Sequence, residues 1–226
     1  MQRAAHRELI DGEGAGTPRE LIENFQDIAL VNRWLGGVRT TLREIDRLAV
    51  TPRTFLDVGT GGADMPLAVL DHLRTRGVEA VCIGLDRSPS ALAAAAGRAR
   101  GRPDITFVRG DALALPYDDG RFDLVTCNLT LHHLDPPDAV RALAEMARVG
   151  RDVIVNDLRR SPAAWLLARA VFPMFTTNRL TLHDGPLSVR RAYSPSEALT
   201  LAREAGWTRV EVRSHFAARM SLSGGR

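Results

Sequence analysis

Three acidic residues and a glycine-rich turn stand where a fold of alternating strands and helices would bring them together. Asp57 precedes the turn Gly59-Thr60-Gly61-Gly62, Asp86 ends the next apolar run, and Asp111 follows the third. Carboxylates accept hydrogen bonds from ribose hydroxyls or from an adenine amino group. In open α/β sheets, ligands bind at the carboxyl ends of the strands. The pattern therefore predicts a binding site for a nucleoside-containing cofactor.

The glycine turn favours a ligand without phosphate groups. A turn that binds a dinucleotide is expected to read G-x-G-x-x-G, but the sixth position here is Asp64. A carboxylate at a helix N-terminus would repel a pyrophosphate bound there. An NAD-dependent oxidoreductase is an alternative, disfavoured by Asp64 and by the motif Gly110-Asp111-Ala112.

The polar residues at the strand ends have structural as well as functional interpretations. Asp57 would either accept bonds from backbone donors of the turn or orient a cationic cofactor through water. Asp86 would accept both hydroxyls of a ribose. Asp111 would accept an adenine amino group or cap its own loop, and Asn128 should face the reactive end of the cofactor.

The hydrophobic pattern predicts the elements that must position these residues. Predicted strands cover residues 54–58, 80–85, 105–108, 122–128, 152–156, 210–212 and 217–222. Predicted helices cover residues 18–34, 38–48, 63–76, 89–101, 136–149 and 195–206. The first starts after Thr17 as N-cap with Glu20 three residues later, and the last starts after the cap Ser194 with Glu197. Strands alternating with helices predict a parallel sheet with helices on both faces.

Two segments depart from this alternation. Residues 1–16 are polar and glycine-rich, which predicts a loose arm. In an insertion from Asp157 to about Ser194, an apolar helix starts at Ser161-Pro162 and ends at Pro173, and residues 174–194 show no clear period. The aromatic residues of the N-terminal helices and the insertion are expected mostly to pack in the core; they are Phe25, Trp34, Trp165, Phe172 and Phe175.

Five motifs together resemble the class I S-adenosylmethionine-dependent methyltransferases, with the UbiE-like small-molecule group nearest. The resemblance covers about residues 50–160. The motifs are Asp57-Val58-Gly59-Thr60-Gly61-Gly62, Asp86, Gly110-Asp111-Ala112, Phe122-Asp123-Leu124-Val125 and Leu131-His132-His133-Leu134. The chemistry agrees, because a sulfonium cofactor has no phosphate and tolerates surrounding acids.

The resemblance implies an α/β fold with a Rossmann-like, doubly wound sheet of seven strands in the order 3-2-1-4-5-7-6, the last strand antiparallel. Residues 1–50 would form an N-terminal helical cap and residues 51–226 the methyltransferase domain, with about 157–194 as a lid. The cofactor would be S-adenosyl-L-methionine and its product S-adenosyl-L-homocysteine. The residues expected to bind it are Asp57, Gly59, Thr60, Gly61, Asp86, Arg87, Gly110, Asp111, Ala112 and Asn128.

The acceptor implied by the resemblance is a small aromatic, phenolic or quinone-like molecule, methylated on oxygen or on carbon. Transfer to a hydroxyl needs a base, and His183 beside Asp184 is the first candidate. His132 is the second, although this histidine pair is usually structural in the family. Arginines of the insertion would pair with its acids or hold an anionic substrate group.

Composition limits the other function classes. The net charge is only +3, and the basic residues, all arginine, are scattered, so we expect no nucleic-acid partner. An RNA methyltransferase is an alternative that the triplet Asp135-Pro136-Pro137 supports poorly, because it stands late after the fourth strand and favours a helix start. A non-catalytic protein that binds S-adenosylmethionine is a further alternative.

Cellular context follows from the same composition. Cys82 and Cys127 give neither a disulfide framework nor a metal signature, so no metal is expected. No apolar run is long enough to span a membrane, and residues 1–11 lack the apolar core of a signal peptide. We expect a cytoplasmic monomer or homodimer.

Overall fold

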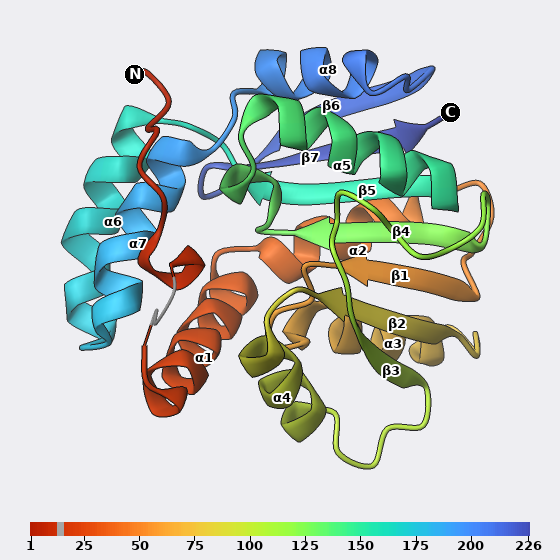
Figure 1. The fold of residues 1–226 in the computed structure, drawn as a ribbon, viewed down its shortest axis with the longest axis horizontal. Coiled ribbons are helices and arrows are strands. Elements are labelled where there is room, and N and C mark those ends of the chain that lie inside the picture. Colours follow the sequence, from red (N-terminus) through yellow and green to blue (C-terminus); the bar gives the residue numbers. More distant parts are fainter. Residues whose placement is uncertain (13–15) are drawn as a thin grey trace.

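A mixed sheet of seven strands runs through the middle of the molecule (Figure 1). The computed structural model describes residues 1–12 and 16–226. The strand order is β3-β2-β1-β4-β5-β7-β6, and β7 pairs antiparallel with both neighbours. This confirms the predicted order. The strands are β1 (Thr54–Val58), β2 (Val81–Asp86), β3 (Ile105–Arg109), β4 (Phe122–Asn128), β5 (Gly150–Leu158), β6 (Arg209–His215) and β7 (Arg219–Gly225).

Helices cover both faces of the sheet (Figure 1). Alternate residues of a strand point to opposite faces, so Leu56 packs on the side of α5 and α8, while Phe55 packs on the side of α2 and α3. The helices are α1 (Pro18–Trp34), α2 (Gly37–Asp46), α3 (Asp64–Thr75), α4 (Pro89–Arg98), α5 (Pro136–Val149), α6 (Pro162–Phe175), α7 (Arg179–Arg191) and α8 (Pro195–Glu204). Two 3-10 turns, η1 (Leu9–Asp11) and η2 (Leu131–His133), lie near the strand ends. None of the described helices is both long and apolar enough to cross a membrane.

The helix starts predicted from capping residues are confirmed. Thr17 and Glu20 form a capping box at α1, and Ser194 and Glu197 form another at α8. Asp135 is the N-cap residue of α5, so the triplet at this position starts a helix as expected.

The insertion after β5 differs from its prediction in two places. Pro173 lies inside α6 and does not end it; the helix stops two residues later, so only its last turn bears the cost of the missing N–H. Helix α7 lies within residues 174–194, where the sequence shows no hydrophobic period. Its buried face includes Thr181, Asp184, Ser188 and Arg191, and a helix that buries polar side chains leaves no hydrophobic period to detect.

Residues 1–12 are not the loose arm that their polarity predicted. Ala4 N–H donates to the Arg190 carbonyl, and the Arg3 guanidinium donates to the carbonyls of His132 and Leu134. The segment therefore lies against η2 and α7, where hydrogen bonds replace apolar packing. Residues 13–15 of the predicted arm fall outside the described residues.

The aromatic residues of the cap and insertion do not mostly pack in the core. Trp34 and Phe175 are 76% and 78% exposed, and α6 contains no buried residue. Phe25 is the exception, since it is buried beside the glycine turn. The prediction failed because α6 packs on α7, at the edge of the fold, and not on the sheet.

Trp207 anchors the outer end of the sheet to α5. Its indole is buried, and Nε1–H donates to the Leu143 carbonyl at 2.9 Å. Trp207→Phe should lower the free energy of unfolding by about 2 kcal/mol, because it removes this bond and leaves unfilled space. Urea denaturation would measure the loss. Phe216→Leu, at a position 82% exposed, is the control, and equal midpoints for both variants would contradict the assignment.

Candidate functional site

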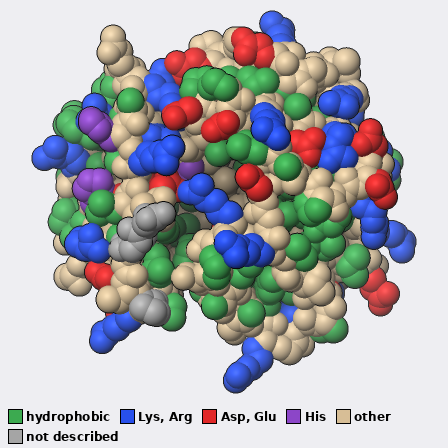
Figure 2. All heavy atoms as spheres, in the orientation of Figure 1, with side chains coloured by type: hydrophobic (Ala, Val, Ile, Leu, Met, Phe, Trp, Pro, Cys, Tyr) green, Lys and Arg blue, Asp and Glu red, His purple; other side chains and the backbone are tan. Residues whose placement is uncertain are grey.

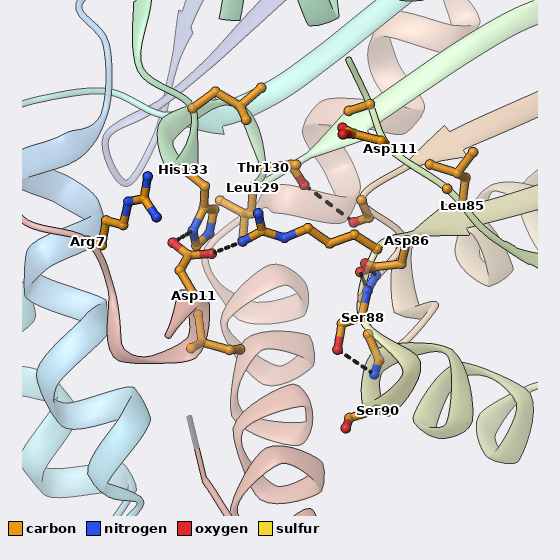
Figure 3. A pocket seen from close by; sticks show the side chains of 18 of the residues that line it. Arg7, Asp11, Leu85, Asp86, Ser88, Ser90, Asp111, Leu129, Thr130 and His133 are labelled. Carbon is orange, nitrogen blue, oxygen red and sulfur yellow. Dashed lines mark hydrogen bonds and ion pairs between the residues drawn. The ribbon is translucent and has the colours of Figure 1, made fainter. Parts of the chain in front are cut away.

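A cavity of about 510 Å³ opens at the carboxyl ends of β1, β2 and β3 (Figure 3). A smaller one of about 70 Å³ lies between α1 and the glycine turn. Each residue predicted to bind the cofactor lines one or both. The larger is lined by Gly59, Gly61, Asp86, Arg87, Gly110, Asp111 and Ala112. The smaller is lined by Asp57, Gly59, Thr60, Gly61 and Asn128.

The turn after β1 needs glycine for backbone reasons. Gly59 and Gly61 have φ angles of +71° and +51°, in the left-handed region. A Cβ atom on Gly59 would also collide with the side chain of Thr130. The amides of Gly59 and Thr60 both donate to the Leu85 carbonyl, which fixes the turn against the end of β2. The turn is therefore preformed at the cavity wall.

Asp86 is held by backbone donors and keeps free acceptor capacity. Its Oδ2 accepts the Gly61 N–H and its Oδ1 accepts the Ser88 N–H, both at 2.9 Å. An ionised carboxylate has about four lone-pair positions, so each oxygen can accept a second bond. Asp86 thus faces the cavity in a fixed orientation (Figure 3), as a site for vicinal hydroxyls requires.

The loop after β3 forms the next part of the wall. Asp111 Oδ1 accepts the Leu113 N–H at 2.9 Å, which is the loop-capping role considered from the sequence. The side chain is exposed and lines the cavity, so its other oxygen remains available to a ligand. A Cβ on Gly110 would contact Leu85, so the backbone here approaches β2 closely.

Asp57 is buried at the floor of the smaller cavity. Its Oδ1 accepts hydrogen bonds from Thr126 Oγ1 at 2.6 Å and Asn128 Nδ2 at 3.2 Å, which are side chains of β4 and not the backbone donors of the turn considered from the sequence. Burial away from water raises the pKa of Asp57 to about 6, even though these donors act in the opposite direction.

Asp64 carries negative charge into the first turn of α3. Its Oδ2 accepts a hydrogen bond from Asn32 Nδ2 at 2.9 Å, and both residues line the smaller cavity. A pyrophosphate bound at this helix N-terminus would meet that carboxylate. The geometry therefore agrees with a cofactor that carries no phosphate.

The N-terminal segment closes one side of the larger cavity, which the sequence did not suggest. Asp11 lies between His133 Nδ1 at 2.8 Å and Arg87 Nη2 at 2.9 Å (Figure 3). Burial would raise the pKa of Asp11, but His133 and Arg87 hold it below its usual value. Burial lowers the pKa of His133, yet Glu8 and Asp11 outweigh this and raise it to about 9. Such pairs between distant segments leave no local sequence signal.

The two candidate bases lie elsewhere. Neither His183 nor His132 is among the described residues that line the two cavities. His183 is half exposed on α7 and contacts Asp184 at 2.7 Å, while Asp184 also accepts the N–H groups of Leu9 and Ile10. His132 is buried with its Nδ1 at 2.6 Å from Asp157. The structure thus gives neither imidazole a contact with the cavity, whereas His133 lines it.

The surface around the site carries both signs of charge. Figure 2 shows arginine and acidic side chains interspersed around a hollow near the centre of this face. No broad basic area surrounds the hollow in this view, in keeping with the net charge of +3.

Comparisons with known proteins agree with this site. Residues 55–152 match the family model described as a methyltransferase domain. Demethylmenaquinone methyltransferase of Deinococcus radiodurans is 37% identical over 68% of this chain and 65% of its own length. The enzyme of the same name from Roseiflexus castenholzii is 29% identical over 70% of this chain and 69% of its own length. Human N-acetylserotonin methyltransferase, solved with S-adenosylmethionine, superposes with a TM-score of 0.71 at 12% identity, covering 98% of this chain and 63% of that one.

The fold and site define a Rossmann-like protein that binds a nucleoside cofactor without phosphate. The chain belongs to the class I S-adenosylmethionine-dependent methyltransferases, of the UbiE-like type. The alignments with these two bacterial relatives span about two thirds of each relative's length.

Asp57 should make stability depend on pH. Because its pKa in the folded state, about 6, lies above its ordinary 3.8, the bound proton stabilises the fold below pH 4, and this contribution is lost as pH rises through 6. Between pH 5 and pH 7.5, wild-type unfolding free energy should fall relative to Asp57→Asn by roughly 1–2 kcal/mol. Urea denaturation of both proteins at both pH values would measure this difference in unfolding free energy. If the difference is the same at pH 5 and pH 7.5, Asp57 is already ionised at pH 5.

Proposed function

We propose that this chain transfers the methyl group of S-adenosylmethionine to a small aromatic acceptor of the quinone or phenol type. The observation that carries the proposal is the larger cavity, where the glycine turn, Asp86 and the Gly110–Ala112 loop converge. The two bacterial relatives named for demethylmenaquinone support a quinone-like acceptor.

The cofactor would lie across the strand ends in one orientation. Adenine would pack by the loop after β3, with its amino group at Asp111, and the ribose hydroxyls would bond to Asp86. The methionine end would then reach Gly59 and Gly61, which line both cavities. This places the sulfonium near Asp57, whose carboxylate favours positive charge.

The acceptor would enter from the side of α1. Leu21, Phe25 and Ile28 of this helix line the two cavities and offer an apolar wall to an aromatic ring. The sulfonium is already activated, so the protein contributes alignment and exclusion of water. Carbon methylation of an electron-rich reduced quinone would need less help from a base than transfer to a hydroxyl.

The proposed function is tested by turnover. Purified protein would be incubated with S-adenosylmethionine and, separately, with a reduced 1,4-naphthoquinone lacking the methyl group, a simple phenol, and RNA. Mass spectrometry of the products should show S-adenosylhomocysteine and a methylated quinol. Methylation of the phenol alone would contradict a quinone-like acceptor. Binding without turnover would favour the non-catalytic alternative, and methylated RNA would overturn the assignment of a small acceptor.

Asp86→Ala should weaken S-adenosylmethionine binding about 100-fold, because it removes two charge-assisted hydrogen bonds to the ribose. Isothermal titration calorimetry would measure the affinity, and thermal denaturation would show whether the sheet stays folded. Asp119→Ala is the matched control, since this side chain is 76% exposed and pairs with Arg148. Unchanged affinity in a folded Asp86→Ala protein would disprove the ribose assignment.

The cytoplasmic location and the monomeric or dimeric state stay predictions. Because the proposed acceptor is a small molecule, the proposed reaction needs no basic surface that binds nucleic acid.

A further inference from the structure

Two adjacent histidines of η2 meet a buried glutamate of the N-terminal segment. His132 Nε2 lies 3.5 Å from Glu8 Oε1, and His133 Nε2 lies 3.8 Å from Glu8 Oε2. In the described part of the chain, one nitrogen or oxygen ligand atom from each of these three residues lies within 4.8 Å of the other two. Two ligands of a tetrahedral zinc ion, each about 2.0–2.1 Å from it, are about 3.4 Å apart. The spacing therefore suits one bound ion after a small contraction.

The imidazoles are oriented as metal ligands are. His132 Nδ1 contacts Asp157 at 2.6 Å, and His133 Nδ1 contacts Asp11 at 2.8 Å. In neutral rings these carboxylates would keep the proton on Nδ1, which leaves Nε2 unprotonated, at 3.5 Å from Glu8 in His132 and at 3.8 Å in His133. Metal-bound histidines commonly donate their second N–H to a carboxylate, which fixes the ring and raises its basicity.

One carboxylate oxygen of Glu8 lacks a hydrogen bond. Its side chain is 3% exposed, and Oε2 accepts a hydrogen bond from Ser188 Oγ at 2.9 Å. Oε1 is buried and accepts no hydrogen bond from the described residues; the basic groups near it are His132 Nε2 at 3.5 Å and Arg191 Nε at 4.0 Å. A buried carboxylate oxygen without a hydrogen bond is costly, so this atom can still accept a bound cation.

The two imidazole rings lie side by side, with centroids 4.3 Å apart. A divalent cation that displaces the ring protons at Nε2 would bind both nitrogens and the carboxylate together.

We propose that Glu8, His132 and His133 bind one divalent first-row transition-metal ion, represented by Zn²⁺, and that this ion fixes the N-terminal segment beside the cofactor cavity. Sequence reasoning weighed only cysteine patterns, and Glu8 is far from the histidines along the chain. Asp11, which holds His133, also bonds to Arg87 at the cavity wall, so the ion would brace that side of the cavity.

Metal binding is tested first, on untagged full-length protein stripped with a chelator. Calorimetry with Zn²⁺ should show one equivalent bound, and Co²⁺ should give the visible absorption bands of a low-coordinate site. Glu8→Gln should weaken Zn²⁺ binding at least tenfold. Asp11→Asn, which leaves all three ligands in place, should weaken it 10- to 100-fold through His133.

A matched control separates this site from adventitious binding to a surface histidine. His72 also contacts a carboxylate, Asp46, but lies outside the cluster. His72→Asn should bind Zn²⁺ like the wild type. Less than a molar equivalent of bound Zn²⁺, or equal losses in Glu8→Gln and His72→Asn, would overturn the proposal. If Glu8→Gln fails to fold, the stoichiometry and Co²⁺ spectrum of the wild type decide.

The bracing role has its own readout, independent of methyl transfer. Trypsin should cleave after Arg7 at least tenfold more slowly with Zn²⁺ than with a chelator, because Glu8 is then a ligand. The Asp11→Asn protein should show a smaller difference. Equal cleavage rates with and without bound Zn²⁺ would refute the bracing role, whatever the outcome for S-adenosylmethionine.

Discussion

A buried chain of hydrogen bonds ties the helical cap to the carboxyl ends of the central strands. Asp57 of β1 accepts from Asn128 of β4, Asn128 accepts from Thr41 of α2, and Thr41 accepts from Asn156 of β5. Asn156 also donates to the Gly37 carbonyl at the start of α2. Because buried polar groups need partners, this chain allows α2 only one position over the strand ends. The site depends on that position, since α1 immediately precedes α2.

The same chain concentrates negative charge where a cationic cofactor would react. Asp57 lies under the turn after β1, and Asp64 begins the helix that follows it. Arg219 is a buried cation on β7; burial lowers its pKa to about 10, and it donates to Asn32 Oδ1 at 2.9 Å. Asn32 in turn donates to Asp64, so the Asn32 amide links the Arg219 guanidinium to the Asp64 carboxylate by hydrogen bonds. A sulfonium gains from such an environment, whereas a phosphate would be repelled.

The sequence predicted the features that depend on local pattern. The alternation of elements predicted a sheet with helices on both faces, the family resemblance implied the strand order, and the cavity residues followed from their places at strand ends. The sequence did not predict α7, whose buried side chains include polar and charged residues. The buried face of α7 has Asp184 and Arg191 where an amphipathic helix would have apolar residues, so no period was visible. Pro173 was given its usual helix-ending role, but lies where a helix has few bonds left to lose.

The N-terminal segment shows why such contacts escape a linear reading. Its backbone groups pair with charged side chains of α7: Asp184 accepts the amides of Leu9 and Ile10, and Arg191 donates to the His6 carbonyl at 2.6 Å. A segment held by paired charges gains little stability from burial alone, so its position depends on the charge state of its partners. The position of the N-terminal wall of the cavity therefore depends on charged partners, while the position of the wall formed by the sheet is fixed by the hydrophobic core.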